Sequence, residues 1–303
     1  MSTTDLPPLR IATFNIRFDG QSGLLSNQIK EQYVQSPIGT NQETPWRIRR
    51  PKVADTITFH KVDVVGFQEA LYNQVQDFEY LFGSNWGWTG VGRDDGKKKG
   101  EFVPIFYNKN RLQLLESTSW WLSETPDVPG SIGWDAGLPR VVTQAKFLDR
   151  LTNKTFHHIN THFDDRGEKA RDESARLILN RTQELNLTTH EAIILTGDFN
   201  VEEDSSCYKT LVGKQNSSDH EKDKFIFSDT RYDLSHDGTK SFGHQYTFTG
   251  FSSSEPLKRI DFVMIDSTSV GKSRVRTVNH GVIPNRFDDG MYISDHRAVV
   301  ADL

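Results

Sequence analysis

The stretch AIILTGDFN, residues 192–200, decides how this chain is interpreted. Four apolar residues, two of them β-branched, run towards a glycine, which is typical of a buried strand that ends in a turn. Side chains alternate between the two faces of a strand, so Asp198 and Asn200 are expected on the same side, beyond the end of the sheet. A carboxylate there can accept a proton from water or hold a hard cation, and the amide adds hydrogen bonds without charge. A GDxN motif alone also fits an ordinary Asp/Asn turn, so its interpretation depends on the rest of the chain.

Polar side chains also interrupt or end other predicted strands. A carboxylate at the end of an apolar strand, such as Glu69, is costly unless it is paired or binds a cation. The same reasoning applies to Asp261, which lies within the apolar strand predicted over 259–265. Each position alone has a structural alternative; Asn15, for example, also fits an edge or a bulge. The complete set is Asn15, Glu69, His162, Asp198, Asn200, Asp261, Asp295 and His296.

The composition is that of a folded chain with a sizeable core. Of its 303 residues 35% are hydrophobic, and 19 Phe, 8 Tyr and 6 Trp supply large apolar surfaces. The 36 basic and 41 acidic residues give a net charge of −5, which disfavours sequence-blind binding of nucleic acid. The single cysteine, Cys207, excludes an intramolecular disulfide and is expected to be a small buried residue. Without a signal peptide or a membrane-length apolar run, we expect a soluble cytoplasmic or nuclear protein.

Hydrophobic periodicity and turn residues predict alternating strands and helices. Pro51 is expected to break its helix or to start a second one, and Asp172 and Arg176 are expected to pair along another. Polar segments over 19–43 and 213–223 are predicted as loops. Predicted strands cover 9–17, 62–69, 86–91, 101–107, 112–122, 141–148, 155–163, 225–228, 245–249, 259–265, 275–283 and the C-terminal residues. Predicted helices cover 44–57, 71–82, 168–187 and 204–212.

Together, the polar strand ends resemble the endonuclease/exonuclease/phosphatase superfamily, which includes deoxyribonuclease I-like nucleases, inositol polyphosphate 5-phosphatases and deadenylases. The motifs QE, TH, GDFN, ID and SDH occur here in the family's order, and the resemblance spans nearly the whole chain. The segments WWLSETP (120–126) and GWDAGLPR (133–140) are similar to those of poorly characterised bacterial and fungal metal-dependent hydrolases. The resemblance implies a four-layer α/β sandwich of two mainly antiparallel sheets flanked by helices. We expect a tail over 1–8 and a single catalytic domain over 9–303.

The resemblance also implies how water and a metal ion are held. Glu69 resembles the principal ligand of Mg²⁺, with Asn15 and Asp295 close to the ion and Mn²⁺ as the alternative cation. Asp198 resembles the general base that activates the attacking water. Asn200 resembles its orienting and oxyanion-binding partner.

The remaining positions resemble residues that contact the substrate. His296 is similar to the family's phosphate-contacting histidine, with Asp261 as the carboxylate that orients it. His162 is similar to a second histidine found in the deoxyribonuclease and phosphatase branches. Glu101 falls where those branches keep a carboxylate paired to that histidine, and Arg140 falls where a substrate-contacting arginine is usual.

The shared motifs do not choose the substrate. The acidic balance and a tryptophan-rich segment, with Trp121 and Trp134 as expected pocket residues, favour a small phosphorylated substrate of a phosphodiesterase or phosphomonoesterase. The alternative is an endonuclease or exonuclease on DNA or RNA, including a deadenylase, for which Arg47 and Lys97–Lys99 would line a basic groove. Three adjacent lysines are otherwise an ordinary solvated loop. A binding module without activity is the third hypothesis, which the filled catalytic positions oppose.

Overall fold

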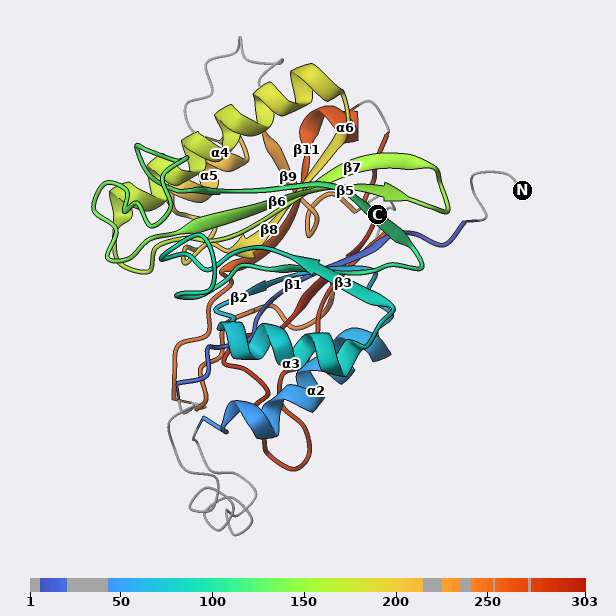
Figure 1. The fold of residues 1–303 in the computed structure, drawn as a ribbon, viewed down its shortest axis with the longest axis vertical. Coiled ribbons are helices and arrows are strands. Elements are labelled where there is room, and N and C mark those ends of the chain that lie inside the picture. Colours follow the sequence, from blue (N-terminus) through green and yellow to red (C-terminus); the bar gives the residue numbers. More distant parts are fainter. Residues whose placement is uncertain (1–5, 21–42, 215–224, 235–240, 253, 272–273) are drawn as a thin grey trace.

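Two β-sheets pack face to face in this protein (Figure 1). The computed structural model describes residues 6–20, 43–214, 225–234, 241–252, 254–271 and 274–303. Each sheet is mixed, with antiparallel neighbours in the majority and some parallel pairs. The predicted α/β sandwich is confirmed.

The first sheet has seven strands in the order β10-β12-β13-β1-β2-β4-β3. These are β1 (Arg10–Asn15), β2 (Val64–Gln68), β3 (Trp86–Thr89), β4 (Ile105–Asn108), β10 (Phe242–Gly243), β12 (Asn279–Val282) and β13 (Val299–Asp302). We call this sheet 1. The adjacent strands β1 and β2 are completely buried apart from Arg10, because helices cover one face of sheet 1 and the second sheet covers the other.

The second sheet, sheet 2, has six strands in the order β5-β6-β7-β8-β11-β9. These are β5 (Leu112–Trp121), β6 (Val141–Asp149), β7 (Lys154–His162), β8 (Ala192–Asp198), β9 (Phe227–Asp229) and β11 (Asp261–Asp266). All seven residues of β8 are buried, as its run of apolar side chains predicts.

Helices form the two outer layers of the sandwich (Figure 1). The helices α2 (Trp46–Phe59) and α3 (Tyr72–Phe82) cover sheet 1 through an aromatic-rich core that includes Phe67 and Phe78. The helices α4 (Glu168–Thr189) and α5 (Ser206–Leu211) cover sheet 2, and the short α6 (Ser267–Gly271) follows β11. A separate apolar cluster fills the space between the sheets. The buried Cys207 belongs to the core beneath α4 and α5, as predicted.

Some predicted elements were wrong in their limits. Pro51 lies inside an unbroken α2, where the buried Val53 and Ile57 hold the helix on sheet 1. The strand predicted over 101–107 begins only at Ile105, because Phe102 forms isolated bridges instead. Residues 245–249 form no strand beyond isolated bridges of Phe248.

One predicted contact was also wrong, and some predictions lie outside the described residues. Arg176 pairs with Glu173, three residues before it, at 2.7 Å. Asp172 accepts hydrogen bonds from Ser206 of α5 instead. Most of the loops predicted over 19–43 and 213–223 lie outside the described residues. No helix in the described part of the chain is long and apolar enough to cross a membrane.

Candidate active site

The polar strand ends predicted from the sequence meet at one edge of the sandwich. In sheet 2, His162 at the end of β7 and Asp261 at the start of β11 are both paired in register with Asp198. In sheet 1, Asn15 ends β1, and Glu69 directly follows β2 with a left-handed φ of 61°. A glutamate rarely adopts this conformation, which is characteristic of functional sites.

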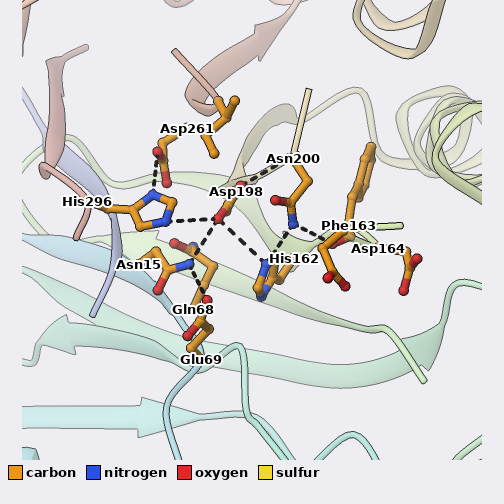
Figure 2. Close-up of polar contacts among 12 residues, drawn as sticks. Asn15, Gln68, Glu69, His162, Phe163, Asp164, Asp198, Asn200, Asp261 and His296 are labelled. Atoms are coloured by element: carbon orange, nitrogen blue, oxygen red, sulfur yellow. Dashed lines mark hydrogen bonds and ion pairs between the residues drawn. The ribbon is translucent and has the colours of Figure 1, made fainter. Parts of the chain in front are cut away.

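Asp198 is the centre of the contacts (Figure 2). The side chain is almost completely buried, and its Oδ2 accepts a hydrogen bond from Asn15 Nδ2 at 2.9 Å. The same oxygen lies 3.6 Å from His162 Nε2 and 3.6 Å from His296 Nε2. Its Oδ1 accepts the backbone N–H of Asn200 at 2.9 Å. Burial, reinforced by the charge of Asp261, raises the pKa of Asp198 to about 7.

His296 is held between two carboxylates. Its Nδ1 lies 2.9 Å from Asp261 Oδ2, and its Nε2 faces Asp198. Burial alone would lower the pKa of His296, but the charges of Asp261 and Asp198 outweigh burial and raise it well above the usual value. The ring of Phe248 packs edge-on against the imidazole at 5.0 Å. The geometry therefore favours an imidazolium in a fixed orientation.

His162 is neutral, and its proton can be placed. Asn200 Nδ2 contacts both the Phe163 carbonyl, at 3.0 Å, and His162 Nε2, at 3.0 Å. The carbonyl requires a donor, so the nitrogen of the Asn200 amide must point this way and His162 Nε2 must accept. The imidazole proton then lies on Nδ1, which is 3.9 Å from Glu101 Oε2. Burial, with the charges of Arg140 and Arg93, lowers the pKa of His162 well below the usual value.

This arrangement bears on the role predicted for Asn200. Both N–H groups of its carboxamide are directed at protein acceptors, so neither is free for an oxyanion. Its backbone N–H orients Asp198, and its side chain orients His162. Orientation is the part of the predicted role that the geometry supports.

Glu101 lies between β3 and β4 of sheet 1, and Arg140 directly precedes β6 of sheet 2. Glu101 accepts a hydrogen bond from Arg93 Nη1 at 2.8 Å, and burial, with the charge of Glu69, raises its pKa to about 7. Arg140 is 4% exposed and bound to Asp164 at 3.3 Å and Asp165 at 2.7 Å. Its guanidinium is therefore engaged within the protein.

The two tryptophans expected in a pocket, Trp121 and Trp134, have no hydrogen bond to the polar centre among the described residues. Trp121 is buried against Val103 and Val141, and its indole N–H donates to the Arg93 carbonyl at 2.6 Å. Its placement is that of a core residue, and its expected role in a pocket remains a prediction. Trp134 is half-buried with a left-handed φ of 52°, and its backbone N–H donates to the Glu124 carboxylate.

Asn15, Glu69 and Asp295 provide oxygen donors suited to a hard cation. Asn15 Nδ2 donates to Glu69 Oε1 at 2.9 Å as well as to Asp198, while its Oδ1 accepts only one backbone N–H among the described contacts and keeps a second lone pair. Burial raises the pKa of Asp295, and the negative charge of Glu69 adds to this effect. Two carboxylates that repel each other are stabilised by a cation, so this donor set fits Mg²⁺. A second group of possible ligands, Asp198, Asp261 and His296, has donor atoms within 4.8 Å of one another.

Three residues near the site were missed by the sequence analysis. Arg17 lies 3.8 Å from Glu69, and Arg93 bonds Glu101. Asp164 holds Arg140 and the backbone N–H of Gly137. Arg17 is two residues after Asn15, and this spacing could have indicated that its side chain lies near the site. Arg93 lies in a glycine- and lysine-rich turn, where no sequence pattern indicates a role in the site.

The fold and this polar centre define a class of protein. The model of the Endonuclease/Exonuclease/phosphatase family matches residues 12–296, so the chain belongs to that family. Members of the family hydrolyse phosphoric esters, and this protein is an enzyme of that class. The family predicted from the strand-end motifs is confirmed.

Individual relatives share much of the chain. The uncharacterized protein L388 of Acanthamoeba polyphaga mimivirus is 30% identical over 190 residues, which cover 61% of this chain and 69% of that protein. The structure is similar to the endonuclease/exonuclease/phosphatase from Bacteroides vulgatus, with a TM-score of 0.79, 33% identity and 98% of both chains covered. It is also similar to a mannosyl-6-phosphatase from Bacteroides thetaiotaomicron, with a TM-score of 0.78, 29% identity, and 97% of this chain and 98% of that chain covered.

Proposed function

We propose that this protein is a Mg²⁺-dependent hydrolase of a small phosphorylated substrate, in which Asp198 activates water for in-line attack on phosphorus. The observation that carries the proposal is the environment of Asp198, whose Oδ2 faces two imidazole Nε2 atoms at 3.6 Å each. A buried carboxylate with a pKa raised to about 7 is a stronger base than an ordinary aspartate. Attack requires this carboxylate to accept one proton from the water.

The proposed metal ligands are Glu69, Asn15 and Asp295, with Mn²⁺ as an alternative to Mg²⁺. We prefer this set to the Asp198, Asp261 and His296 group, because the imidazolium there has both nitrogens protonated and offers no lone pair to a cation. A divalent cation at these oxygens supplies positive charge to the phosphoryl oxygens of the bound ester. Arg17, at 3.8 Å from Glu69, adds positive charge beside the same site.

The two histidines, His296 just before β13 of sheet 1 and His162 at the end of β7 of sheet 2, have different roles in this proposal. The His296 imidazolium, oriented by Asp261, would donate from Nε2 to a phosphoryl oxygen and stabilise charge that develops in the transition state. The neutral His162 is kept in one tautomer by Asn200, and Glu101 faces its protonated Nδ1. Asn200 thus acts in this proposal by orienting both His162 and Asp198.

A phosphorylated sugar is the first substrate class to test. The mannosyl-6-phosphatase relative acts on such a phosphomonoester, and the net charge of −5 disfavours a long polyanion. Lys97–Lys99 are exposed, and Lys98 Nζ lies 4.4 Å from the ring centroid of Tyr72. The exposed lysine turn, together with Arg47, supplies the basic residues of the nuclease alternative.

The test is a substrate panel with the metal varied. The purified protein would be assayed with Mg²⁺, Mn²⁺ or a chelator on p-nitrophenyl phosphate, bis(p-nitrophenyl) phosphate, mannose 6-phosphate and short oligonucleotides. We expect metal-dependent hydrolysis of the small esters, loss of activity with the chelator and recovery on adding Mg²⁺. Preferential cleavage of oligonucleotides, abolished in Lys97→Ala/Lys98→Ala/Lys99→Ala, would replace this proposal with the nuclease alternative.

A further inference from the structure

A buried carboxamide joins the two sheets directly beneath the active site. Asn160 lies on β7 of sheet 2 and has no exposed surface. Its Nδ2 donates to the Phe67 carbonyl of β2 at 2.8 Å and to the Pro104 carbonyl at 3.3 Å. Its Oδ1 accepts from Gln68 Nε2 of β2 at 2.8 Å and from Thr196 Oγ1 of β8 at 3.0 Å. The full hydrogen-bonding capacity of one carboxamide is used, and most of it reaches the opposite sheet.

The residues of this network lie one layer below the site. On three strands, a network residue stands two positions before a residue of the site. These pairs are Thr13 and Asn15 on β1, Asn160 and His162 on β7, and Thr196 and Asp198 on β8. Residues two apart on a strand share a face, so each network residue lies beneath its partner in the site. Gln68, which also donates to Thr13 Oγ1 at 3.0 Å, directly precedes Glu69.

Side chains of sheet 2 pack directly against the backbone of β2 at Gly66. A Cβ atom on Gly66 of β2 would lie 2.3 Å from Asn160 Oδ1 and 2.6 Å from Thr196 Oγ1. A side chain at this position would force β2 away from β7, so glycine permits the Asn160 bonds to form. The apolar cluster deeper between the sheets provides attraction but little directional restraint.

We propose that Asn160 is a positioning residue that fixes the separation of the two halves of the active site. One half, Asn15 and Glu69, belongs to sheet 1; the other, His162 and Asp198, belongs to sheet 2. Water activation and phosphoryl contact, which rest on the function proposed above, need both halves in register. A misplacement of about 1 Å between reacting groups lowers a rate by about 10²-fold.

The test compares Asn160→Leu with His158→Leu. Asn160→Leu preserves side-chain size and removes every bond of the network's central residue. His158 is the matched control, because it is buried on the same face of β7, two residues earlier, and bonds Thr196 Oγ1 at 2.8 Å within its own sheet. We expect kcat on p-nitrophenyl phosphate to fall about 10²-fold in Asn160→Leu, whereas His158→Leu should keep kcat within about threefold.

Two readouts separate positioning from general disruption. The rise in Tm that Mg²⁺ produces should persist in Asn160→Leu, because Glu69 and the other proposed ligands belong to sheet 1. In crystal structures superposed on sheet 1, the Glu69–Asp198 separation should change by more than about 0.5 Å. If Asn160→Leu does not fold, Gln68→Met takes its place, since it removes a cross-sheet bond at nearly constant volume.

An unchanged separation, or an equal loss of kcat in His158→Leu, would overturn the proposal. A wild-type protein that hydrolyses no phosphoester would instead refute the proposed function. The crystallographic comparison would then decide on its own whether Asn160 sets the spacing of the sheets.

Discussion

Asp198 is the residue whose replacement should separate chemistry from metal binding. Asp198→Asn keeps an oxygen to accept the Asn200 N–H but removes the proposed base. Loss of a general base typically costs about 10²–10⁴-fold, and we expect kcat to fall by about 10³-fold or more. The Mg²⁺-induced shift in Tm should remain. Steady-state kinetics and thermal unfolding measure the two effects.

The control for this substitution is Asp127→Asn. Asp127 has an 83% exposed side chain and pairs with Arg181 on the surface, so its replacement should leave kcat unchanged. Robust turnover by Asp198→Asn would assign the base to another residue.

His296 should contribute charge stabilisation at the transition state. Removing one donor directed at a developing oxyanion lowers a rate by about 10²–10³-fold, which is the loss of kcat we expect for His296→Ala. His280→Ala is a matched control, because His280 is equally buried but lies on β12, where it bonds Ser241. The measurement is kcat on p-nitrophenyl phosphate. Near-normal turnover by His296→Ala would contradict the role given to its imidazolium.

At the scale of strands and helices, the sequence predicts best where a pattern is local. The strand 192–200 and the helix 168–187 correspond closely to β8 and α4, since apolar runs and helical stripes determine burial directly. The ends of elements are less predictable. Phe102 is of a residue type common in strands, yet it forms only isolated bridges to Gly92 and Ala70, which are 10 and 32 residues away in the sequence.

The site shows the same division between local and long-range information. Glu69, His162 and Asp198 were found because each stands at the end of a recognisable strand, and the structure brings them together. The availability of a side chain was not predictable in this way. Arg140 matches a substrate-contacting position by its motif, but its engagement by Asp164 depends on the loop that follows β7.

A buried ion pair beside β11 should contribute strongly to stability. Arg259 bonds Asp229 of β9 through two contacts, at 2.8 and 2.9 Å, and both residues are about 95% buried. Breaking a buried pair costs about 3–5 kcal/mol, because it leaves one charge without a partner. We therefore expect Arg259→Met to lower the free energy of unfolding by that amount in urea titrations. Arg259→Met/Asp229→Asn should recover part of the loss.

The control for this prediction is an exposed pair of the same type. The side chains of Arg176 and Glu173 are 48% and 33% exposed. Arg176→Met breaks their contact and should lower the free energy of unfolding by no more than about 0.5 kcal/mol. Burial by itself would raise the pKa of Asp229, but Arg259 outweighs burial and lowers it. The stability from this pair is therefore present above the unfolded pKa and is lost as the pH falls through the lower folded pKa. A smaller loss in Arg259→Met than in Arg176→Met would contradict the prediction.

At the scale of the whole molecule, the active site exists only where the two sheets meet. Asn15 and Asp198 are 183 residues apart in sequence, yet their side chains are hydrogen-bonded across the sandwich. The space between the sheets is apolar in its depth and polar just beneath the site. An ionisable side chain buried against this layer has no access to solvent, so its protonation affects the stability of the entire sandwich.

His158, which bonds Thr196 of this layer from below, should make the stability of the whole fold depend on pH. Burial lowers its pKa to about 3, whereas histidine in an unfolded chain has a pKa of about 6.5. As the pH falls below about 6.5, the unfolded state gains a proton that the native state does not accept. The free energy of unfolding therefore decreases by up to about 1.4 kcal/mol per pH unit until the folded pKa is reached.

The variant His158→Leu lacks this pH dependence. Urea unfolding of the wild-type protein and of the variant, near pH 7.5 and near pH 5, therefore measures the contribution of His158. Asp198 and Glu101, with pKa values raised to about 7, act in the opposite direction, since the native state binds protons there before the unfolded state does. Their contribution is common to both proteins and cancels in the difference. Between these pH values the wild-type protein should lose about 2 kcal/mol more than His158→Leu. Equal losses would mean that His158 is protonated, or hydrated, between the sheets of the native protein.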